Sequence, residues 1–333
     1  QQTVPLNVYT WGQYIADGSD GSMEVIAEFE KRYPHIKVNY STYDSNEIMY
    51  SKLSNGGITV DVIIPSDYMI ARLIQEDMLL PLDFDNIPNY QYIDENFRNT
   101  AYDPDNIYSV PYMWGTVGIL YNTEYVDEEI TSWQSIFNPE YQKDVFMLDS
   151  YRDTIGITLK MLGYPINTRD EEALNAAKDA LIQQKQDGIV QGYLVDEVKD
   201  KMIGGEAAMA VMWSGDAMYA IMENDSLEYV VPEEGSNVWV DGMVIPKDAK
   251  NKENAEKLID FLCRPEIAKA NCEYVRYACP NTGAIELMGE EYTSNPVQNA
   301  PEEVLAKCEF FNDIDSTFLS VYEAMWMEVK NTK

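Results

Sequence analysis

The sequence is poor in the residue types that most often build metal sites and catalytic centres. It contains one histidine, His35, and four cysteines, and no two cysteines stand in a C-x-x-C spacing. Protein zinc sites draw their ligands from several such residues at short spacings. We therefore expect no metal site and no cofactor. Because no nucleophile stands beside a base, we also expect a binding protein and not an enzyme.

Positive charge is scarce as well. The chain has 24 lysines and arginines against 57 aspartates and glutamates, which gives a formal net charge of -33. Such a charge repels nucleic acid and anionic membranes and attracts cations. It excludes nucleic acid as a partner, but it does not name a ligand, since carboxylates spread over a surface also keep a protein soluble.

Long apolar runs are absent. No stretch approaches the roughly 18 apolar residues of a membrane helix. Residues 1–7 do not combine a basic segment with an apolar one, so we expect a mature domain, or a chain whose targeting segment has been removed. The cysteines lie in the last third of the chain, where both disulfides and free thiols remain open: Cys263, Cys272, Cys279 and Cys308.

Strand-like and helix-like patterns alternate along the chain, which is typical of an α/β protein with largely parallel sheets. We expect strands at 6–10, 36–40, 60–64, 117–121, 145–148, 207–213 and 238–246. We expect helices at 23–33, 46–54, 153–162, 171–187 and 252–262, the last followed by Pro265. The 333 residues suffice for two domains, and the lack of a low-complexity linker suggests that strands join them.

Aromatic residues follow several of the expected strands, where open α/β sheets bind their ligands. Trp11 follows the first strand, Tyr68 the third, and Trp213 ends a later one. A buried alkylammonium ion needs carboxylates to replace its water, and its methylene groups need apolar walls. Aromatic rings provide such walls and add about 0.5 to 2 kcal/mol of cation–π attraction per contact. Most of the 24 tyrosines should nevertheless be structural.

Several segments resemble the spermidine/putrescine-binding proteins of bacterial ABC polyamine importers. They occur in the family's order: WGQY at 11–14, YSTYDSNEIMY at 40–50, IPSDY at 64–68, YSVPYMWG at 108–115, MWSGD at 212–216, VWVDG at 238–242 and YACPN at 277–281. The resemblance implies the two-lobed periplasmic-binding-protein fold, in which each lobe is a mixed sheet flanked by helices and the ligand lies in the cleft between the lobes. It implies one lobe from 1–116 and 241–285 and another from 117–240 and 286–333.

The resemblance also implies a set of ligand-binding residues. The expected aromatic box consists of Trp11, Tyr14, Tyr68, Trp213, Trp239 and Tyr277. Ser66 matches a polar contact at a strand end, Asp241 matches an acidic residue that faces an amine, and Asp153 falls where the family has a glutamate. The alternation of a strand also places the Trp239 and Asp241 side chains on one side.

Some positions depart from the family's pattern. Gln13 stands where members usually have an acidic residue, and Ser150 stands where spermidine-preferring members have an aspartate. Asp216 supplies a carboxylate after Trp213, as in some putrescine-binding members. The expected carboxylates are therefore Asp153, Asp216 and Asp241. We expect both ligands to bind, with spermidine modestly preferred because it fills more of the cleft.

The resemblance further implies a transport role. A monomer would capture spermidine or putrescine by hinge closure and deliver it to a membrane-embedded ABC permease with its ATPase. It would reside in the periplasm, or on the outer face of the membrane as a lipoprotein.

Two alternatives stay open. The first is a protein of the same fold that binds another organic cation, such as a betaine or a thiamine-like amine, because aromatic boxes also suit quaternary ammonium groups. A quaternary ammonium donates no hydrogen bond, so the number of site carboxylates distinguishes the two. The second alternative is an enzyme or a polyamine sensor on the same scaffold, which turnover or a signalling partner would reveal.

Overall fold

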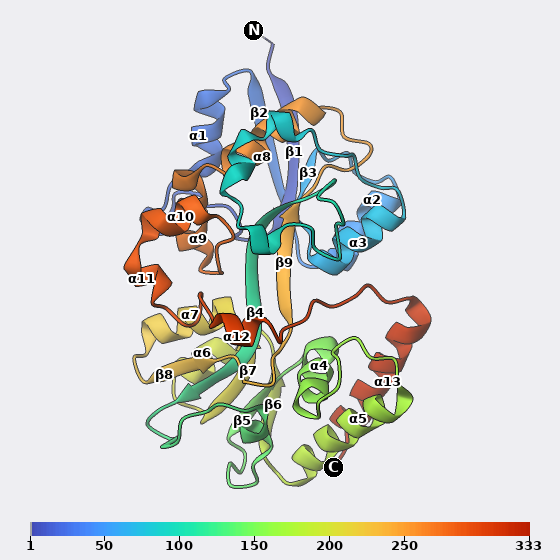
Figure 1. Ribbon diagram of the computed structural model, residues 1–333, viewed down its shortest axis with the longest axis vertical. Helices are drawn as coiled ribbons and strands as arrows, with labels where there is room; N and C mark the ends of the chain where they lie inside the picture. The colour runs from blue at the N-terminus through green and yellow to red at the C-terminus, as the bar shows by residue number, and fades with distance from the viewer. Residues whose placement is uncertain (1) are drawn as a thin grey trace. The chain divides into compact units, whose positions relative to one another are not determined.

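The chain folds into two compact units of α/β structure. The computed structural model (Figure 1) describes residues 2–333. The first unit comprises the chain up to Trp114 together with Trp239–Thr293, and the second comprises Gly115–Val238 and Ser294–Lys333. The chain therefore passes from one unit to the other three times.

The first unit contains a three-stranded parallel sheet in the order β2-β1-β3. Its strands are β1 (Val4–Trp11), β2 (Ile36–Tyr43) and β3 (Val62–Ile63). Its helices are α1 (Val25–Arg32), α2 (Asn46–Ser54), α3 (Asp67–Gln75), α8 (Lys252–Leu262), α9 (Pro265–Val275), α10 (Thr282–Met288) and α11 (Glu290–Thr293).

The core of this unit follows from the apolar pattern of its elements. Leu6 and Val8 alternate along β1 and point into the same cluster of buried side chains. Val25 and Phe29 stand four residues apart on α1, so they share one face of that helix. The ring of Phe29 meets that of Phe261 on α8 with centroids 5.4 Å apart. Segments far apart in the sequence thus share one core.

The second unit is built on a larger mixed sheet in the order β6-β5-β7-β4-β8, to which β9 is added beside β4. Its strands are β4 (Val110–Asn122), β5 (Val145–Leu148), β6 (Val190–Leu194), β7 (Met209–Trp213), β8 (Leu227–Val230) and β9 (Val238–Met243). Its helices are α4 (Tyr151–Met161), α5 (Glu171–Gln186), α6 (Val198–Ile203), α7 (Ser214–Glu223), α12 (Glu302–Leu305) and α13 (Ser316–Asn331). Strands β4 and β9 contain residues of both units.

Helices cover both faces of this larger sheet. Met209 and Val211 of β7 pack into a cluster with α4, α5 and α13, whereas Ala210 and Met212 pack into another with α6 and α7. Figure 1 shows α4, α5 and α13 on one side of the sheet and α6 and α7 on the other. Because both faces are buried, the strand is almost continuously apolar.

The expected fold class, a mixed α/β structure with two sheets flanked by helices, is confirmed. Some elements differ from the sequence prediction. Strand β4 begins at Val110, earlier than expected, and all 13 of its residues are buried. Pro265, expected just beyond a helix, begins α9 at a position that requires no backbone N–H. Helices α3 and α7 were not predicted, and each begins within a motif at the end of a strand, at Asp67 and at Ser214.

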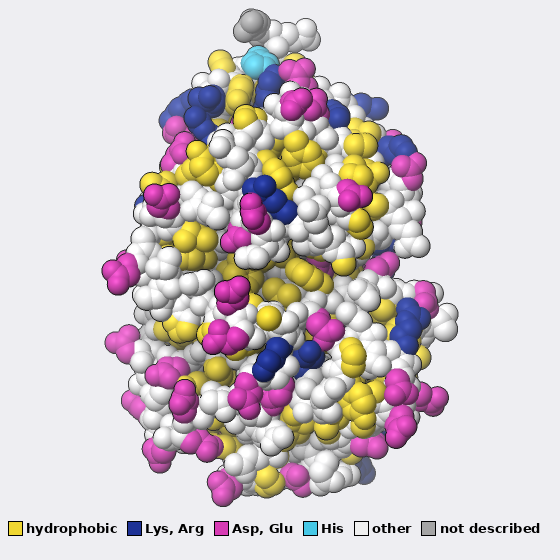
Figure 2. Space-filling model, in the orientation of Figure 1, with side chains coloured by type: hydrophobic (Ala, Val, Ile, Leu, Met, Phe, Trp, Pro, Cys, Tyr) yellow, Lys and Arg dark blue, Asp and Glu magenta, His cyan; other side chains and the backbone are white. Residues whose placement is uncertain are grey.

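The four cysteines are free thiols, and three of them are buried. Among the helices that the structure describes, none is long and apolar enough to cross a membrane. Aspartate and glutamate side chains are scattered over the face drawn in Figure 2 and do not form a single patch there. The high negative charge is therefore at least partly a dispersed surface property.

A glycine of the second unit offers a test of this packing. Gly235 has a φ of 87°, and a Cβ atom there would lie 2.3 Å from the Lys307 carbonyl oxygen. Gly163, in the same unit, has a φ of 84° and open space around it. We expect Gly163→Ala to lower the free energy of unfolding by about 1 kcal/mol, from backbone strain alone. Gly235→Ala should lower it by about 3 kcal/mol or more.

Urea unfolding of both variants, followed by circular dichroism, measures these differences. Equal effects of the two substitutions would contradict the close approach of Gly235 to Lys307.

Candidate ligand-binding site

A buried carboxylate lies at the centre of the residues predicted in the first unit. Asp241 on β9 is 5 % exposed. The Tyr14 hydroxyl donates a hydrogen bond of 2.5 Å to its Oδ2 atom, while Oδ1 is buried and makes no hydrogen bond with the described part of the chain. Burial raises the pKa of Asp241 to about 6, and the hydroxyls of Tyr14 and Ser66 oppose part of that rise. One carboxylate oxygen is thus ready to accept a donor.

Backbone contacts hold this carboxylate in place. Asp241 and Ser66 form an antiparallel bridge, and the Gly242 amide donates to the Pro65 carbonyl at 3.0 Å. The buried Asp67 carboxylate accepts the Val240 amide at 3.0 Å. Asp67 therefore fixes the strand between Trp239 and Asp241, a role that the sequence did not reveal.

The predicted aromatic side chains of the first unit are held in pairs. The Trp11 indole donates to the Ile64 carbonyl at 3.0 Å, and its ring lies 4.9 Å from that of Tyr43. Trp239 and Tyr277 meet edge to face with centroids 4.8 Å apart. Trp11, Trp239 and Tyr277 are each only partly buried. Their rings are thus oriented in advance but retain exposed surface.

Ser66 and Tyr68 belong to a polar network that starts on α2. The Asn46 amide donates to the Ser66 hydroxyl at 3.1 Å and to the Tyr68 hydroxyl at 3.0 Å. The Tyr68 hydroxyl in turn donates to Glu47 at 2.8 Å. Burial raises the pKa of Tyr68 well above its ordinary value, and Glu47 adds to that rise. Glu47 lies in the first turn of α2, whose N-cap is Ser45.

Gln13 stands apart from this group. Its side chain is exposed, its backbone is left-handed with a φ of 53°, and it makes no hydrogen bond within residues 2–333. Tyr14, the next residue, is buried against the Tyr112 ring at a centroid distance of 5.0 Å. The turn at Gln13 lets the chain direct Tyr14 inward while Gln13 stays in solvent.

The second unit holds a similar buried carboxylate. Asp153 lies in the first turn of α4 and is 7 % exposed, and the Ser150 hydroxyl donates to its Oδ2 atom at 2.6 Å. Burial raises the pKa of Asp153 to about 6, and Ser150, the charge of Arg152 and a hydrogen bond from Trp213 each oppose part of the rise. Three residues that were predicted separately from the sequence are therefore hydrogen-bonded to one another: Ser150 and Trp213 both contact Asp153.

Asp216 differs from the other two predicted carboxylates. It lies in the first turn of α7, and its Oδ1 atom is 3.7 Å from the ammonium nitrogen of Lys199 on α6. Asp153 and Asp241 have no ion pair within the part of the chain that the structure describes. Burial raises the pKa of Asp216, and the Lys199 charge opposes that rise.

These residues gather at strand ends. Trp11 ends β1, Ser66 follows β3, Ser150 follows β5 and Trp213 ends β7. Ligands of open α/β sheets bind outside the carboxyl ends of strands. Each unit therefore offers one buried carboxylate beside a hydroxyl and an aromatic ring, in the place where this class of fold binds its ligands.

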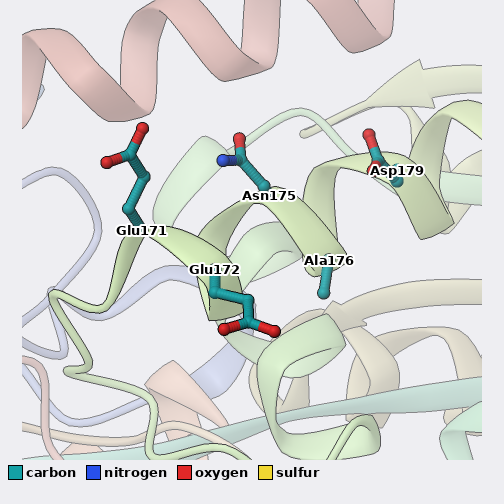
Figure 3. Close-up of a pocket in the computed structure, with 5 residues that line it drawn as sticks. All are labelled: Glu171, Glu172, Asn175, Ala176 and Asp179. Atoms are coloured by element: carbon teal, nitrogen blue, oxygen red, sulfur yellow. The ribbon is translucent and has the colours of Figure 1, made fainter.

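An open hollow on α5 has a different character. Figure 3 shows the five side chains that line it, all from the segment 171–179 of the helix: Glu171, Glu172, Asn175, Ala176 and Asp179. Its three carboxylates are exposed, no aromatic ring lines it, and it contains none of the predicted site residues. It is a solvated acidic helix face.

The chain resembles known solute-binding proteins over nearly its whole length. The family of bacterial extracellular solute-binding proteins matches residues 24–302. A spermidine/putrescine-binding periplasmic protein of Salmonella typhimurium is 34% identical over 327 residues, which cover 98% of this chain and 91% of that protein. The putrescine-binding periplasmic protein PotF of Escherichia coli is 28% identical over 98% of this chain and 92% of its own.

A solved structure agrees. The spermidine/putrescine ABC transporter substrate-binding protein PotD of Streptococcus pneumoniae superimposes with a TM-score of 0.90 at 37% identity, covering 99% of each chain. The resemblance that the motifs indicated is confirmed. This chain belongs to the family of bacterial extracellular solute-binding proteins.

Proposed function

We propose that this protein captures a linear polyamine outside the cytoplasmic membrane and delivers it to an ABC transporter permease. The observation that carries the proposal is Asp241, a buried carboxylate that has neither an ion pair nor a donor to its Oδ1 atom among residues 2–333. A buried charge is costly unless an opposite charge and hydrogen bonds compensate it. A ligand ammonium supplies both.

The remaining residues suit the rest of such a ligand. The Tyr14 hydroxyl keeps one oxygen of Asp241 occupied, so the ammonium is directed to the other. The edge-to-face pair of Trp239 and Tyr277 offers an apolar surface for methylene groups and a π-face for the charge. Asp153, with its Ser150 hydrogen bond, is the corresponding acceptor on the second unit.

These features favour primary amines over other organic cations. The cationic nitrogen of a betaine or thiamine-like ligand has no N–H group, so the charged group itself could not donate to the Asp241 Oδ1 atom. Leaving a buried charged acceptor without a donor costs more than leaving a neutral one. The relatives of this chain named above bind spermidine or putrescine, according to their names. We propose binding and release without turnover.

The transport role completes the proposal. We propose a monomer, in the periplasm or held as a lipoprotein on the outer face of the membrane. Its two units would close on the polyamine, because a ligand that contacts both stabilises the closed state by its higher affinity for it. The membrane-embedded permease, driven by its ATPase, would then receive the ligand.

Removal of one charge tests the proposed site. We expect Asp241→Asn to weaken putrescine and spermidine binding at least 10-fold, because breaking a buried ion pair costs about 3 to 5 kcal/mol. Calorimetry on the folded variant measures the affinity. Glu253→Gln is the control, since Glu253 is an exposed carboxylate of the same unit, paired with Lys257. An Asp241→Asn affinity within twofold of the wild type would remove Asp241 from the site.

The raised pKa values of Asp153 and Asp241, about 6 against an ordinary 3.8, predict opposite pH effects on binding and on stability. Below pH 6 both carboxyls take up protons, so polyamine affinity should fall about 10-fold per carboxylate between pH 7.5 and pH 5. In the ligand-free protein, the folded state binds more protons than the unfolded chain between about pH 4 and 6. These two groups should therefore lower stability as pH rises through that window, by about 3 kcal/mol each.

Calorimetry and urea unfolding across this pH range measure both effects, and the double variant Asp153→Asn/Asp241→Asn should lose this contribution to the pH dependence of stability. An affinity that is constant from pH 7.5 to pH 5 would contradict the participation of the two carboxylates in binding.

Closure of the two units on the ligand can be measured separately from binding. Small-angle scattering should give a smaller radius of gyration with saturating ligand than without it, because the ligand favours the closed state. An unchanged scattering curve, with binding confirmed in the same sample, would argue against hinge closure.

A further inference from the structure

The Lys199 ammonium group lies in a local environment of the kind that a polyamine ammonium needs. It is 3.7 Å from the Asp216 carboxylate and 5.5 Å from the centroid of the Tyr219 ring. The side chains of Lys199 and Asp216 are 33% and 22% exposed, so both are shielded from much of the solvent. The lysine side chain is itself a chain of four methylene groups that ends in an ammonium, which is the chemistry of an aminobutyl group.

We propose that Lys199 is a specificity-determining residue: its ammonium occupies Asp216 in place of a ligand amine, so the protein takes a linear diamine in preference to a triamine. The inference rests on the proposed function, which it makes more specific. It reverses the expectation from sequence that spermidine, with its third amine, would be preferred.

The number of protein cations beside the three predicted carboxylates decides how many ammonium groups a ligand must bring. Of the three predicted carboxylates, Asp153 and Asp241 have hydrogen bonds from the neutral hydroxyls of Ser150 and Tyr14 and no ion pair within residues 2–333. The charge of Arg152 offsets only part of the effect of burial on Asp153, so both carboxylates still need a cation from the ligand. Asp216 already has a cation, so a third ligand ammonium would find no uncompensated carboxylate there.

A third ammonium would also meet repulsion. Two ammonium groups a few ångström apart repel each other, and partial burial strengthens that repulsion. Asp196 also acts on Asp216, since its charge helps to raise the Asp216 pKa. If the Lys199 charge were removed, the negative charges of Asp196 and Asp216 would attract a ligand ammonium in its place.

The test is the ratio of spermidine to putrescine affinity, measured by calorimetry. The wild type should bind putrescine at least as tightly as spermidine. Lys199→Met keeps the apolar stem and removes the charge, so it should raise spermidine affinity at least 5-fold and change putrescine affinity less than twofold. The double variant Lys199→Met/Asp216→Asn should lose the spermidine gain. The matched control is Lys201→Met, since Lys201 lies on the same helix but pairs with Glu206 at 2.9 Å.

A Lys199→Met protein with an unchanged affinity ratio would overturn the inference and leave polyamine binding intact. So would a gain that survives in the double variant. A wild type that binds neither amine would overturn the proposed function, and with it this inference. Thermal melting verifies folding, and Lys199→Gln, which keeps a polar end without the charge, serves the same test if Lys199→Met does not fold.

Discussion

The hydrogen bond from the Tyr14 hydroxyl to the Asp241 carboxylate joins two residues that are 227 positions apart in the sequence. It satisfies one oxygen of a carboxylate that the fold has removed from water, and the other oxygen has no donor in the described part of the chain. A carboxylate in such a place either takes up a proton or recruits a cation, because burial penalises its charge. The raised pKa of Asp241 reflects the first outcome, and the cation binding that we propose is the second.

The architecture around this pair serves to hold it. The segment of β9 that carries Trp239 and Asp241 is fixed by the Asp67 carboxylate and by the bridge to Ser66. In the second unit, Ser150 and Trp213 play comparable parts around Asp153. Both carboxylates have neutral donors that orient them, and neither has an ion pair within residues 2–333. Preorganised acceptors of this kind leave the ligand to provide the charge.

Much of this could be predicted from the sequence, because local patterns record local structure. Apolar runs such as 207–213 predicted buried strands, and motifs after strands predicted where binding residues gather. The spacing of Trp239 and Asp241 on one strand also indicated a shared side. Their contact with a ligand stays a prediction.

Other features depend on contacts between distant segments, which no local pattern encodes. Asp67 was read only as part of a motif, yet its carboxylate contacts the Val240 amide 173 positions away. Asp216 was counted with the ligand carboxylates because its neighbour Trp213 matched the family, whereas the fold brings Lys199 from another helix to its side. Such pairings decide which charges are free, and they require the three-dimensional structure.

We propose that this site selects amines whose N–H groups satisfy buried carboxylates. Native mass spectrometry of the protein with an equimolar mixture of putrescine, spermidine, glycine betaine and thiamine, at two ammonium acetate concentrations, tests it most directly. The account predicts a single polyamine adduct per folded chain, with putrescine retained at both salt concentrations. A betaine or thiamine adduct in preference to either polyamine, or no adduct on a folded chain, would contradict it.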